Sequence, residues 1–249
     1  MTTIVPAVEL RHVSKAFGTL RVLDDVCLAV SAGRAVCILG RSGTGKSVTL
    51  KHIVGLLQPD AGHVLVEGED ITLLAGADLA RVRKRIGLLF QTAALFDSIS
   101  VGENVAFPLR RHTRMSDDEI RARARDRLAQ VGLEREYDKM PADLSGGMKK
   151  RAGLARALVL DPPIVLADEP SAGLDPVTAG EIDALLVALN DRSKTTLIVV
   201  THNIPSARVI GDELVFLHEG RIIAHGDVAT LDSSEIPLVR QFMRSDSSG

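Results

Sequence analysis

The order of apolar and polar residues predicts antiparallel strands at the start of the chain and buried parallel strands after them. Apolar and polar residues alternate within residues 7–30, as in Val8-Glu9-Leu10-Arg11, which is typical of strands with one solvated face. Four later apolar runs are short and continuous, at residues 86–90, 164–167, 197–200 and 214–217. Strands buried on both faces have such runs, so we predict an α/β fold with a parallel sheet between layers of helices.

A different pattern occupies residues 98–160, which we expect to form a helical subdomain. Ser116 and the acidic residues after it have the pattern of a helix N-cap and first turn, and Ile120, Ala124 and Leu128 recur at helical spacing. We expect a single domain, residues 1–249, with an α/β core that includes an antiparallel β part (7–97 and 161–231), the inserted helical subdomain (98–160) and a C-terminal tail (232–249).

Composition excludes several function classes. Of 249 residues, 45% are hydrophobic and 25% are charged, and the formal net charge is −2. This balance gives no electrostatic reason to expect nucleic acid as the main partner. Apolar runs are shorter than the ~18–20 residues of a membrane-spanning helix, and the first residues lack a signal-peptide pattern. We therefore expect a cytoplasmic chain that leaves any membrane spanning to other subunits.

The cysteine content predicts no covalent framework. Cys27 and Cys37 both stand among apolar residues. We expect each to be a buried free thiol in a reducing compartment. From two cysteines we expect neither a disulfide framework nor a zinc site.

A phosphate-binding loop is the strongest chemical signal in the sequence. Gly40 to Ser47 fits the pattern G-x-x-x-x-G-K-[ST], with an apolar strand pattern before it and a helical pattern after it. Backbone N–H groups of such a loop and the helix N-terminus bind phosphates, Lys46 reaches the β- and γ-phosphates, and Ser47 ligates Mg²⁺. The expected nucleotide contacts here are Gly40, Arg41, Ser42, Gly43, Thr44, Gly45, Lys46, Ser47 and Val48.

Two adjacent carboxylates end the apolar run at residues 164–167. Asp168 is in position to hold Mg²⁺, directly or through water. Glu169 follows it and is in position to orient or deprotonate a water molecule that attacks the γ-phosphate. Two solvated acids at the end of a strand are the alternative, which the phosphate-binding loop makes less favourable.

A serine and two glycines before a helical pattern predict a second phosphate-binding surface. Ser145, Gly146 and Gly147 would leave backbone donors open at a helix N-terminus. The basic residues that follow, 149–151, oppose the helix dipole, an arrangement that suits an anion docking from elsewhere. Leu144 to Gly147 with this basic run resembles the signature motif of the ABC-type ATPases.

The resemblance covers nearly the whole chain and implies a P-loop NTPase fold with a RecA-like parallel-sheet core, an N-terminal antiparallel β subdomain and an inserted α-helical subdomain. Phe17 matches the aromatic residue that stacks on adenine in this family, with core packing as the alternative. Gln91 matches the glutamine that senses Mg²⁺ and the γ-phosphate. Asp175 lies in a segment that resembles the D-loop, and His202 matches the switch histidine. The cofactors implied are ATP and Mg²⁺, with Ser47, Gln91 and Asp168 at the metal.

Membership of this family implies two copies arranged head to tail, with ATP between Lys46 of one copy and Ser145 of the other. A homodimer completes two sites most simply, because the chain has one set of motifs. Closure on ATP would then drive a separate integral-membrane permease dimer from the cytoplasmic face of the inner membrane.

Several segments resemble the ATPases of MCE-associated phospholipid-transport systems, the Mla group. They are Met148 after the glycines, residues 94–96 and 103–113, and residues 239–242. This likeness implies lipid trafficking between inner and outer membranes, a periplasmic MCE-domain protein and a STAS-domain protein. Leu95 and Phe96 would lie in the groove that receives the permease, and the tail at 239–242 would cross to the other protomer. Packing within their own domain is the alternative for both.

Met148 stands where most of the superfamily has glutamine. A thioether donates no hydrogen bond, so we expect a weaker ATP-bound dimer. Other ABC systems, such as amino-acid importers and lipoprotein-release transporters, are the alternative function, followed by a soluble ABC ATPase in translation or DNA repair. A P-loop kinase would have no use for Ser145 or His202.

Overall fold

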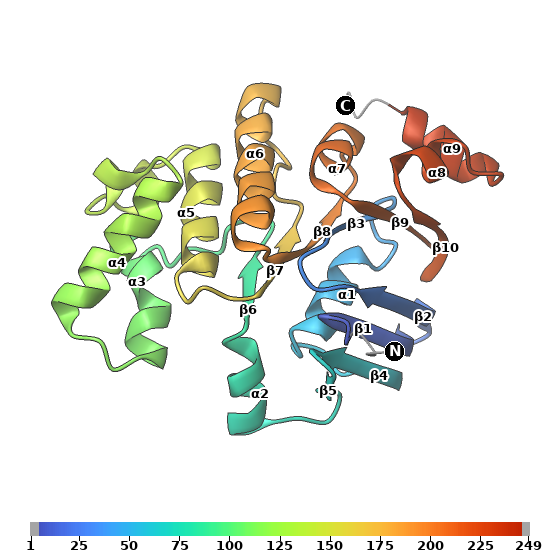
Figure 1. The fold of residues 1–249 in the computed structure, drawn as a ribbon, viewed down its shortest axis with the longest axis horizontal. Coiled ribbons are helices and arrows are strands. Elements are labelled where there is room, and N and C mark those ends of the chain that lie inside the picture. Colours follow the sequence, from blue (N-terminus) through green and yellow to red (C-terminus); the bar gives the residue numbers. More distant parts are fainter. Residues whose placement is uncertain (1–4, 246–249) are drawn as a thin grey trace.

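The computed structural model describes residues 5–245, which form two β-sheets and the helices that cover them (Figure 1). The smaller sheet has the order β2-β1-β4-β5 and is antiparallel. Its strands are β1 (Val8–Phe17), β2 (Leu20–Val30), β4 (Ala61–Val66) and β5 (Glu69–Asp70). This arrangement confirms the antiparallel strands expected within residues 7–30.

The larger sheet has the order β10-β9-β3-β8-β7-β6, and all of its pairs are parallel except β9 with β10. Its strands are β3 (Ala35–Leu39), β6 (Ile86–Leu89), β7 (Ile164–Asp168), β8 (Thr196–Thr201), β9 (Glu213–His218) and β10 (Arg221–Gly226). Each predicted continuous apolar run coincides with one of these strands, and only Phe90 of the run 86–90 falls beyond the end of its strand, β6.

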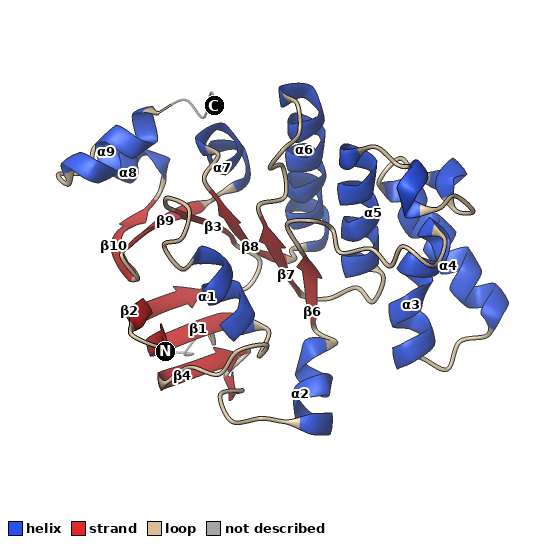
Figure 2. Ribbon diagram, turned by 180° about the vertical axis from the view of Figure 1, so that it is seen from behind, coloured by secondary structure: helices blue, strands red, loops and turns tan. Residues whose placement is uncertain are grey.

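Helices occupy both sides of the larger sheet. They are α1 (Lys46–Ile53), α2 (Gly76–Arg83), α3 (Val101–His112), α4 (Asp117–Gln130), α5 (Gly146–Leu158), α6 (Pro176–Ser193), α7 (Ile204–Ile210), α8 (Val228–Asp232) and α9 (Pro237–Arg244), with short 3₁₀ helices η1 (Glu134–Glu136) and η2 (Pro141–Asp143). Figure 2 shows α6 and α7 on one face, and α1 with the smaller sheet on the other.

Successive residues of one buried strand contribute to two different cores. In β3, Cys37 packs into the core under the helices, whereas Val36 and Ile38 pack into the core under the smaller sheet. Because side chains of a strand point alternately to opposite faces, a strand that is covered on both sides needs apolar residues at every position. This requirement explains the continuous apolar runs in the sequence.

The helical content predicted for residues 98–160 lies in α3, α4 and α5, which stand at one end of the larger sheet (Figure 1). Ser116 caps α4 as predicted, because its Oγ accepts the Glu119 N–H and Glu119 accepts the Ser116 N–H in return. The limits of the predicted subdomains stay predictions. Within residues 5–245, no helix has the length and apolar character needed to cross a membrane.

Described residues of the tail pack on their own chain, as in the alternative kept open above, and the expected crossing to the other protomer stays a prediction. Val239 and Met243 of α9 are buried, and the Phe242 ring contacts Phe216 of β9 edge-on at 4.8 Å between centroids. Residues 246–249 of the predicted tail lie outside the described part.

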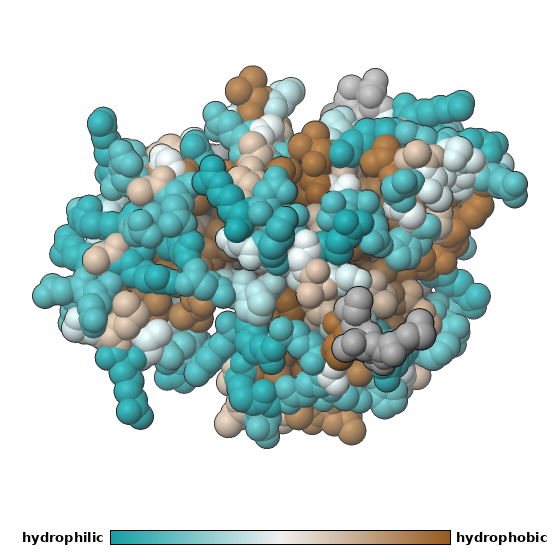
Figure 3. All heavy atoms as spheres, viewed as in Figure 1, coloured by the Kyte–Doolittle hydropathy of each residue, from teal (hydrophilic) through white to brown (hydrophobic). Residues whose placement is uncertain are grey.

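Hydrophilic side chains cover most of the face drawn in Figure 3, with apolar patches between them.

The two cysteines have different environments, which corrects one expectation. Cys37 is buried as predicted, and burial raises the pKa of its thiol far above the ordinary value. Cys27 is exposed, contrary to the prediction. Its strand alternates between faces, and Cys27 falls on the solvated face between the buried Val26 and Leu28.

Candidate active site

Glycines give the loop between β3 and α1 its shape. Gly40, Gly43 and Gly45 have φ angles of 154°, 80° and 102°, in a region that favours glycine. A Cβ atom at Gly45 would lie 2.7 Å from a methyl carbon of Leu23 and 2.8 Å from the Val22 carbonyl oxygen. The close approach of β2 therefore excludes a side chain at Gly45, and α1 begins at the next residue with its first N–H groups free for an anion.

Lys46 is buried and is held by the loop that it follows. Its Nζ donates to the carbonyl oxygens of Gly40 at 2.8 Å and Arg41 at 3.0 Å. It also lies 3.8 Å from Oε1 of Glu169. Burial lowers the pKa of Lys46, and the negative charges of Glu169 and Asp168 oppose that shift. These contacts hold the ammonium group beside the cavity that Lys46 lines.

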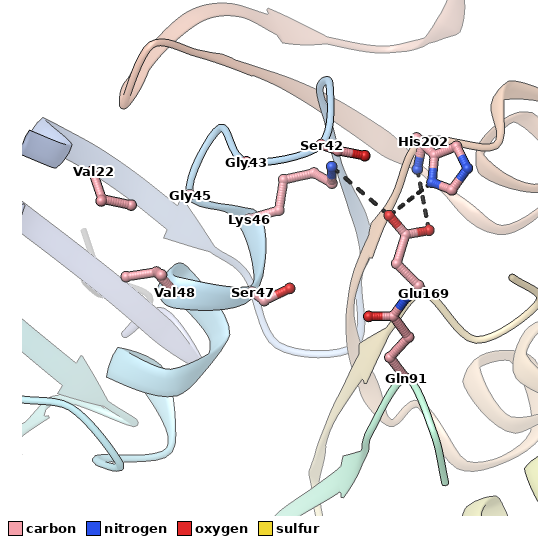
Figure 4. A pocket seen from close by; sticks show the side chains of 10 residues that line it. All are labelled: Val22, Ser42, Gly43, Gly45, Lys46, Ser47, Val48, Gln91, Glu169 and His202. Atoms are coloured by element: carbon pink, nitrogen blue, oxygen red, sulfur yellow. Dashed lines mark hydrogen bonds and ion pairs between the residues drawn. The ribbon is translucent and has the colours of Figure 1, made fainter. Parts of the chain in front are cut away.

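The side chains of Glu169 and His202 point toward each other, and the Lys46 ammonium group approaches Glu169 from the side of the phosphate-binding loop (Figure 4). Glu169 Oε1 lies 2.9 Å from His202 Nδ1, and Oε2 accepts the His202 N–H at 3.3 Å and the Thr201 hydroxyl at 3.1 Å. Glu169 is buried and has a φ angle of 46°, a strained conformation for a residue with a side chain. The structure therefore holds this carboxylate in one orientation beside a histidine and a lysine.

Of the residues expected at Mg²⁺, Ser47 and Gln91 line the same cavity, and Asp168 lies beside it as the hydrogen-bond partner of Ser47. Ser47 Oγ donates to Asp168 Oδ1 at 2.9 Å, and the Gln91 side chain lines the cavity nearby (Figure 4). Burial raises the pKa of Asp168, and the Ser47 hydrogen bond lowers it. A hydroxyl, a carboxylate and an amide oxygen are the hard donors that Mg²⁺ prefers. These residues fit the ion.

The cavity itself has a volume of about 240 Å³ and is lined by Val22, Ser42, Gly43, Gly45, Lys46, Ser47, Val48, Gln91, Glu169 and His202. Most ligand pockets measure roughly 300–1,000 Å³, so this space suits the phosphate part of a nucleotide better than a whole one. Val22 is a lining residue that the sequence reasoning missed. It belongs to a distant strand, β2, and no motif marks it.

Phe17 does not line this cavity. It ends β1 and is 48% exposed, so the alternative of core packing is wrong. The Lys15 ammonium lies 5.7 Å from the centre of its ring. Phe17 is therefore partly open to solvent, and its predicted role at adenine stays a prediction.

The signature segment and the D-loop lie outside the cavity. Ser145 caps α5 by accepting the Met148 N–H at 3.3 Å. Gly147 packs against α6, because a Cβ there would lie 2.4 Å from a methyl carbon of Thr178. Asp175 caps α6 by accepting the Val177 and Thr178 N–H groups. Within one described chain, therefore, Ser145, Gly146, Gly147 and Asp175 do not join the residues around Lys46.

Lys150 does not line the cavity but contacts the backbone of Glu169, which does, and the sequence predicted a different role for it. We expected the basic run at 149–151 to attract an anion, but Lys150 is buried and its Nζ donates to the backbone carbonyl of Glu169 at 2.9 Å. The guanidinium Nη2 of Arg151, the next residue of the basic run, lies 3.8 Å from the carboxylate Oε2 of Glu181 in α6. A lysine at the fifth position of a helix gives no signal of such a contact, because only the tertiary fold brings α5 to the end of β7.

Comparison with known proteins identifies the family. The sequence model described as ABC transporter matches residues 23–172. The chain is 39% identical over 241 residues to the intermembrane phospholipid transport system ATP-binding protein MlaF of Escherichia coli K12, covering 97% of this chain and 90% of that one. A solved structure of the dimeric ATP-binding cassette MJ0796, bound to ADP and Pi, has a TM-score of 0.83 and 36% identity, covering 88% of this chain and 98% of that chain.

A second relative is named for a different transport function. The chain is 44% identical over 237 residues, or 95% of its length, to the probable ribonucleotide transport ATP-binding protein mkl of Mycobacterium tuberculosis H37Rv. It spans 66% of the length of that relative. The fold expected from the signature motif is confirmed, because the solved cassette superimposes on most of the chain. With the family match over residues 23–172 and these identities, the chain belongs to the ABC transporter family and has the fold of its ATPase subunits.

Proposed function

We propose that the chain hydrolyses ATP as the nucleotide-binding subunit of an ABC transport complex that moves phospholipid between the inner and outer membranes. The observation that carries the ATPase activity is the arrangement of Glu169 between His202 and Lys46 at the end of the phosphate-binding loop. The observation behind the lipid role is the 39% identity to MlaF, over nearly the full length of both chains.

The residues of the cavity divide the reaction between them. Lys46 and the N–H groups of the loop bind the phosphates, and Phe17 stacks on adenine. Glu169 accepts a proton from the water whose oxygen bonds to the γ-phosphorus, while the bond from that phosphorus to the ADP oxygen breaks. His202 holds the Glu169 carboxylate and contacts the γ-phosphate. Mg²⁺, held by Ser47, Asp168 and Gln91, would neutralise phosphate charge.

A second copy of the chain completes the site in this proposal. The cavity of one chain is small, and Ser145 with its two glycines lies outside it. Both facts are expected if the signature helix of one protomer covers ATP bound to the other. The solved relative of the same fold is dimeric, as its description states.

A permease docks, in this proposal, on an apolar groove between α2, α3 and the end of β6. Phe96, Phe107 and Pro108 line it, and the two phenylalanine rings lie 5.0 Å apart. Phe96 lines this groove, whereas Leu95 packs against the core, and the expected contact of either residue with a permease stays a prediction. Such a contact would hold the chain at the cytoplasmic face of the inner membrane, with a periplasmic MCE-domain protein and a STAS-domain protein as further partners.

Substitution of the proposed base tests the ATPase mechanism. Glu169→Gln in the purified chain should nearly abolish ATP turnover while ATP remains bound, because the amide cannot accept the proton. Glu134→Gln, an exposed acid in η1, is the matched control and should turn over ATP normally. Full turnover in Glu169→Gln would reject this residue as the base.

Purification from the native membrane tests the transport role separately. The tagged chain should bring with it a permease and an MCE-domain protein, and phospholipid should be present in the complex. Recovery with an amino-acid permease or a lipoprotein-release permease would reject the lipid role but keep the transport ATPase. Recovery with ribosomes would reject transport.

A further inference from the structure

Three exposed residues of the smaller sheet, which the proposed ATP site does not use, bring nitrogen, oxygen and sulfur donors together. They are His12 of β1 and Asp25 and Cys27 of β2, and one ligand atom of each lies within 4.8 Å of the others. His12 Nδ1 lies 2.8 Å from Asp25 Oδ1 and 3.5 Å from Cys27 Sγ. Ligands in a tetrahedral zinc site are separated by roughly 3.3–3.6 Å, so small side-chain shifts would accommodate an ion.

Two β-bulges produce this cluster. Leu10 pairs with Leu28 and Val13 with Val26, so that the two residues Arg11 and His12 stand opposite Cys27 alone. The next pair is Lys15 with Leu23, and the extra residue there is on β2. His12 and Asp25 have φ angles of 54° and 57°, and these left-handed conformations are unfavourable for residues with side chains. Bulges redirect side chains and often mark functional positions.

Side chains of the cluster and of a nearby residue accept hydrogen bonds from the backbone N–H groups at the bulges. Cys27 Sγ accepts the His12 N–H at 3.3 Å, and Ser14 Oγ accepts the Asp25 N–H at 3.0 Å. These two hydrogen bonds help to fix the backbone around the three donors. The side chains of His12 and Asp25 are 75% and 64% exposed, so an ion can reach them from solvent without opening the fold.

We propose that His12, Asp25 and Cys27 bind a divalent transition-metal ion of the zinc class, with water completing its coordination. Imidazole and thiolate ligands select Zn²⁺ and similar ions over Mg²⁺ and Ca²⁺, which prefer oxygen. The ion replaces the hydrogen bond between His12 and Asp25 and links β1 to β2. Counting cysteines alone excluded a zinc site from the sequence, because the histidine and aspartate ligands reach Cys27 only through the bulges.

Titration of the purified chain with Co²⁺ alone, without nucleotide or Mg²⁺, tests this site. Co²⁺ reports on a thiolate ligand through a charge-transfer absorption band. The wild-type chain should show the band at one equivalent, and Zn²⁺ should abolish it by displacement. Cys27→Ser should lose the band, and His12→Ala should weaken Co²⁺ binding at least about tenfold.

Two matched controls use the same chain. His63→Ala removes an exposed histidine of the same sheet that lies 2.7 Å from Asp70 but has no thiol beside it, and Cys37→Ser removes the buried thiol. Both should bind Co²⁺ as the wild type does. In a second measurement, Zn²⁺ should raise the wild-type Tm but not that of Cys27→Ser. The proposal is wrong if Cys27→Ser keeps the band, if the wild type shows none, or if His63→Ala weakens binding equally.

Discussion

The contact between Lys150 and Glu169 makes a specific prediction about turnover. Lys150 Nζ donates to the backbone carbonyl of Glu169, the proposed base, at 2.9 Å, and Glu169 has a strained φ angle of 46°. Lys150→Met keeps the length of the side chain but removes the ammonium group. Without it, the backbone at Glu169 can relax toward a more favourable conformation, which turns the carboxylate away from His202 and Lys46.

The size of the effect follows from the partners of that carbonyl. A hydrogen bond from a charged donor contributes about 1.5–3 kcal/mol. The Glu169 carbonyl also accepts the Ala172 N–H at 3.2 Å, and burial lowers the pKa of Lys150, which shows that the buried charge itself is unfavourable. Both facts favour the lower value, about 1.5 kcal/mol, which corresponds to about a tenfold loss of kcat.

Steady-state ATPase kinetics measure this loss. Because Lys150 does not line the cavity, KM for ATP should stay unchanged while kcat falls. Lys149→Met is the matched control, since Lys149 is the neighbouring, partly exposed lysine, and it should have wild-type kcat. Lys150→Arg keeps a charged donor and should recover part of the rate. The reasoning is refuted if Lys150→Met has wild-type kcat, or if KM rises while kcat is unchanged.

Three further substitutions test other parts of the site. Burial raises the pKa of Asp168, so its ionised form destabilises the fold at neutral pH. Asp168→Asn should therefore abolish turnover yet raise Tm. This gain in Tm over the wild type should disappear as pH falls through the raised pKa toward the ordinary value, because the wild-type carboxyl group then becomes neutral as well. Gly45→Ala should prevent ATP binding and lower the unfolding free energy by about 1–3 kcal/mol in urea titrations, because of its φ of 102° and the Val22 carbonyl. Met148→Gln should strengthen the ATP-bound dimer in light scattering; unchanged dimerisation and turnover would contradict the role given to this thioether.

Local patterns were sufficient for the buried strands, for the helical character of residues 98–160 and for most residues of the cavity. Continuous apolar runs identified the buried strands, because a strand that is covered on both faces needs apolar residues throughout. The phosphate-binding loop identified Lys46 and Ser47, since a loop between a strand and a helix binds phosphates through its own backbone. Asp168 and Glu169 could be predicted because the carboxyl ends of neighbouring parallel strands meet at one edge of the sheet.

Contacts between distant segments could not be predicted in this way. Val22 lines the cavity because the smaller sheet packs close to Gly45, and Lys150 supports Glu169 because α5 packs against the end of β7. The exposed Cys27 lies beside His12 and Asp25 because two bulges change the register of β1 and β2. The sequence by itself therefore determined the buried strands, the helical character of residues 98–160 and the phosphate-binding loop, each of which depends on residues close together in the chain. Which side chains surround Glu169, and which donors gather at Cys27, was decided only by the tertiary structure, because packing and strand register bring together residues that no local spacing relates.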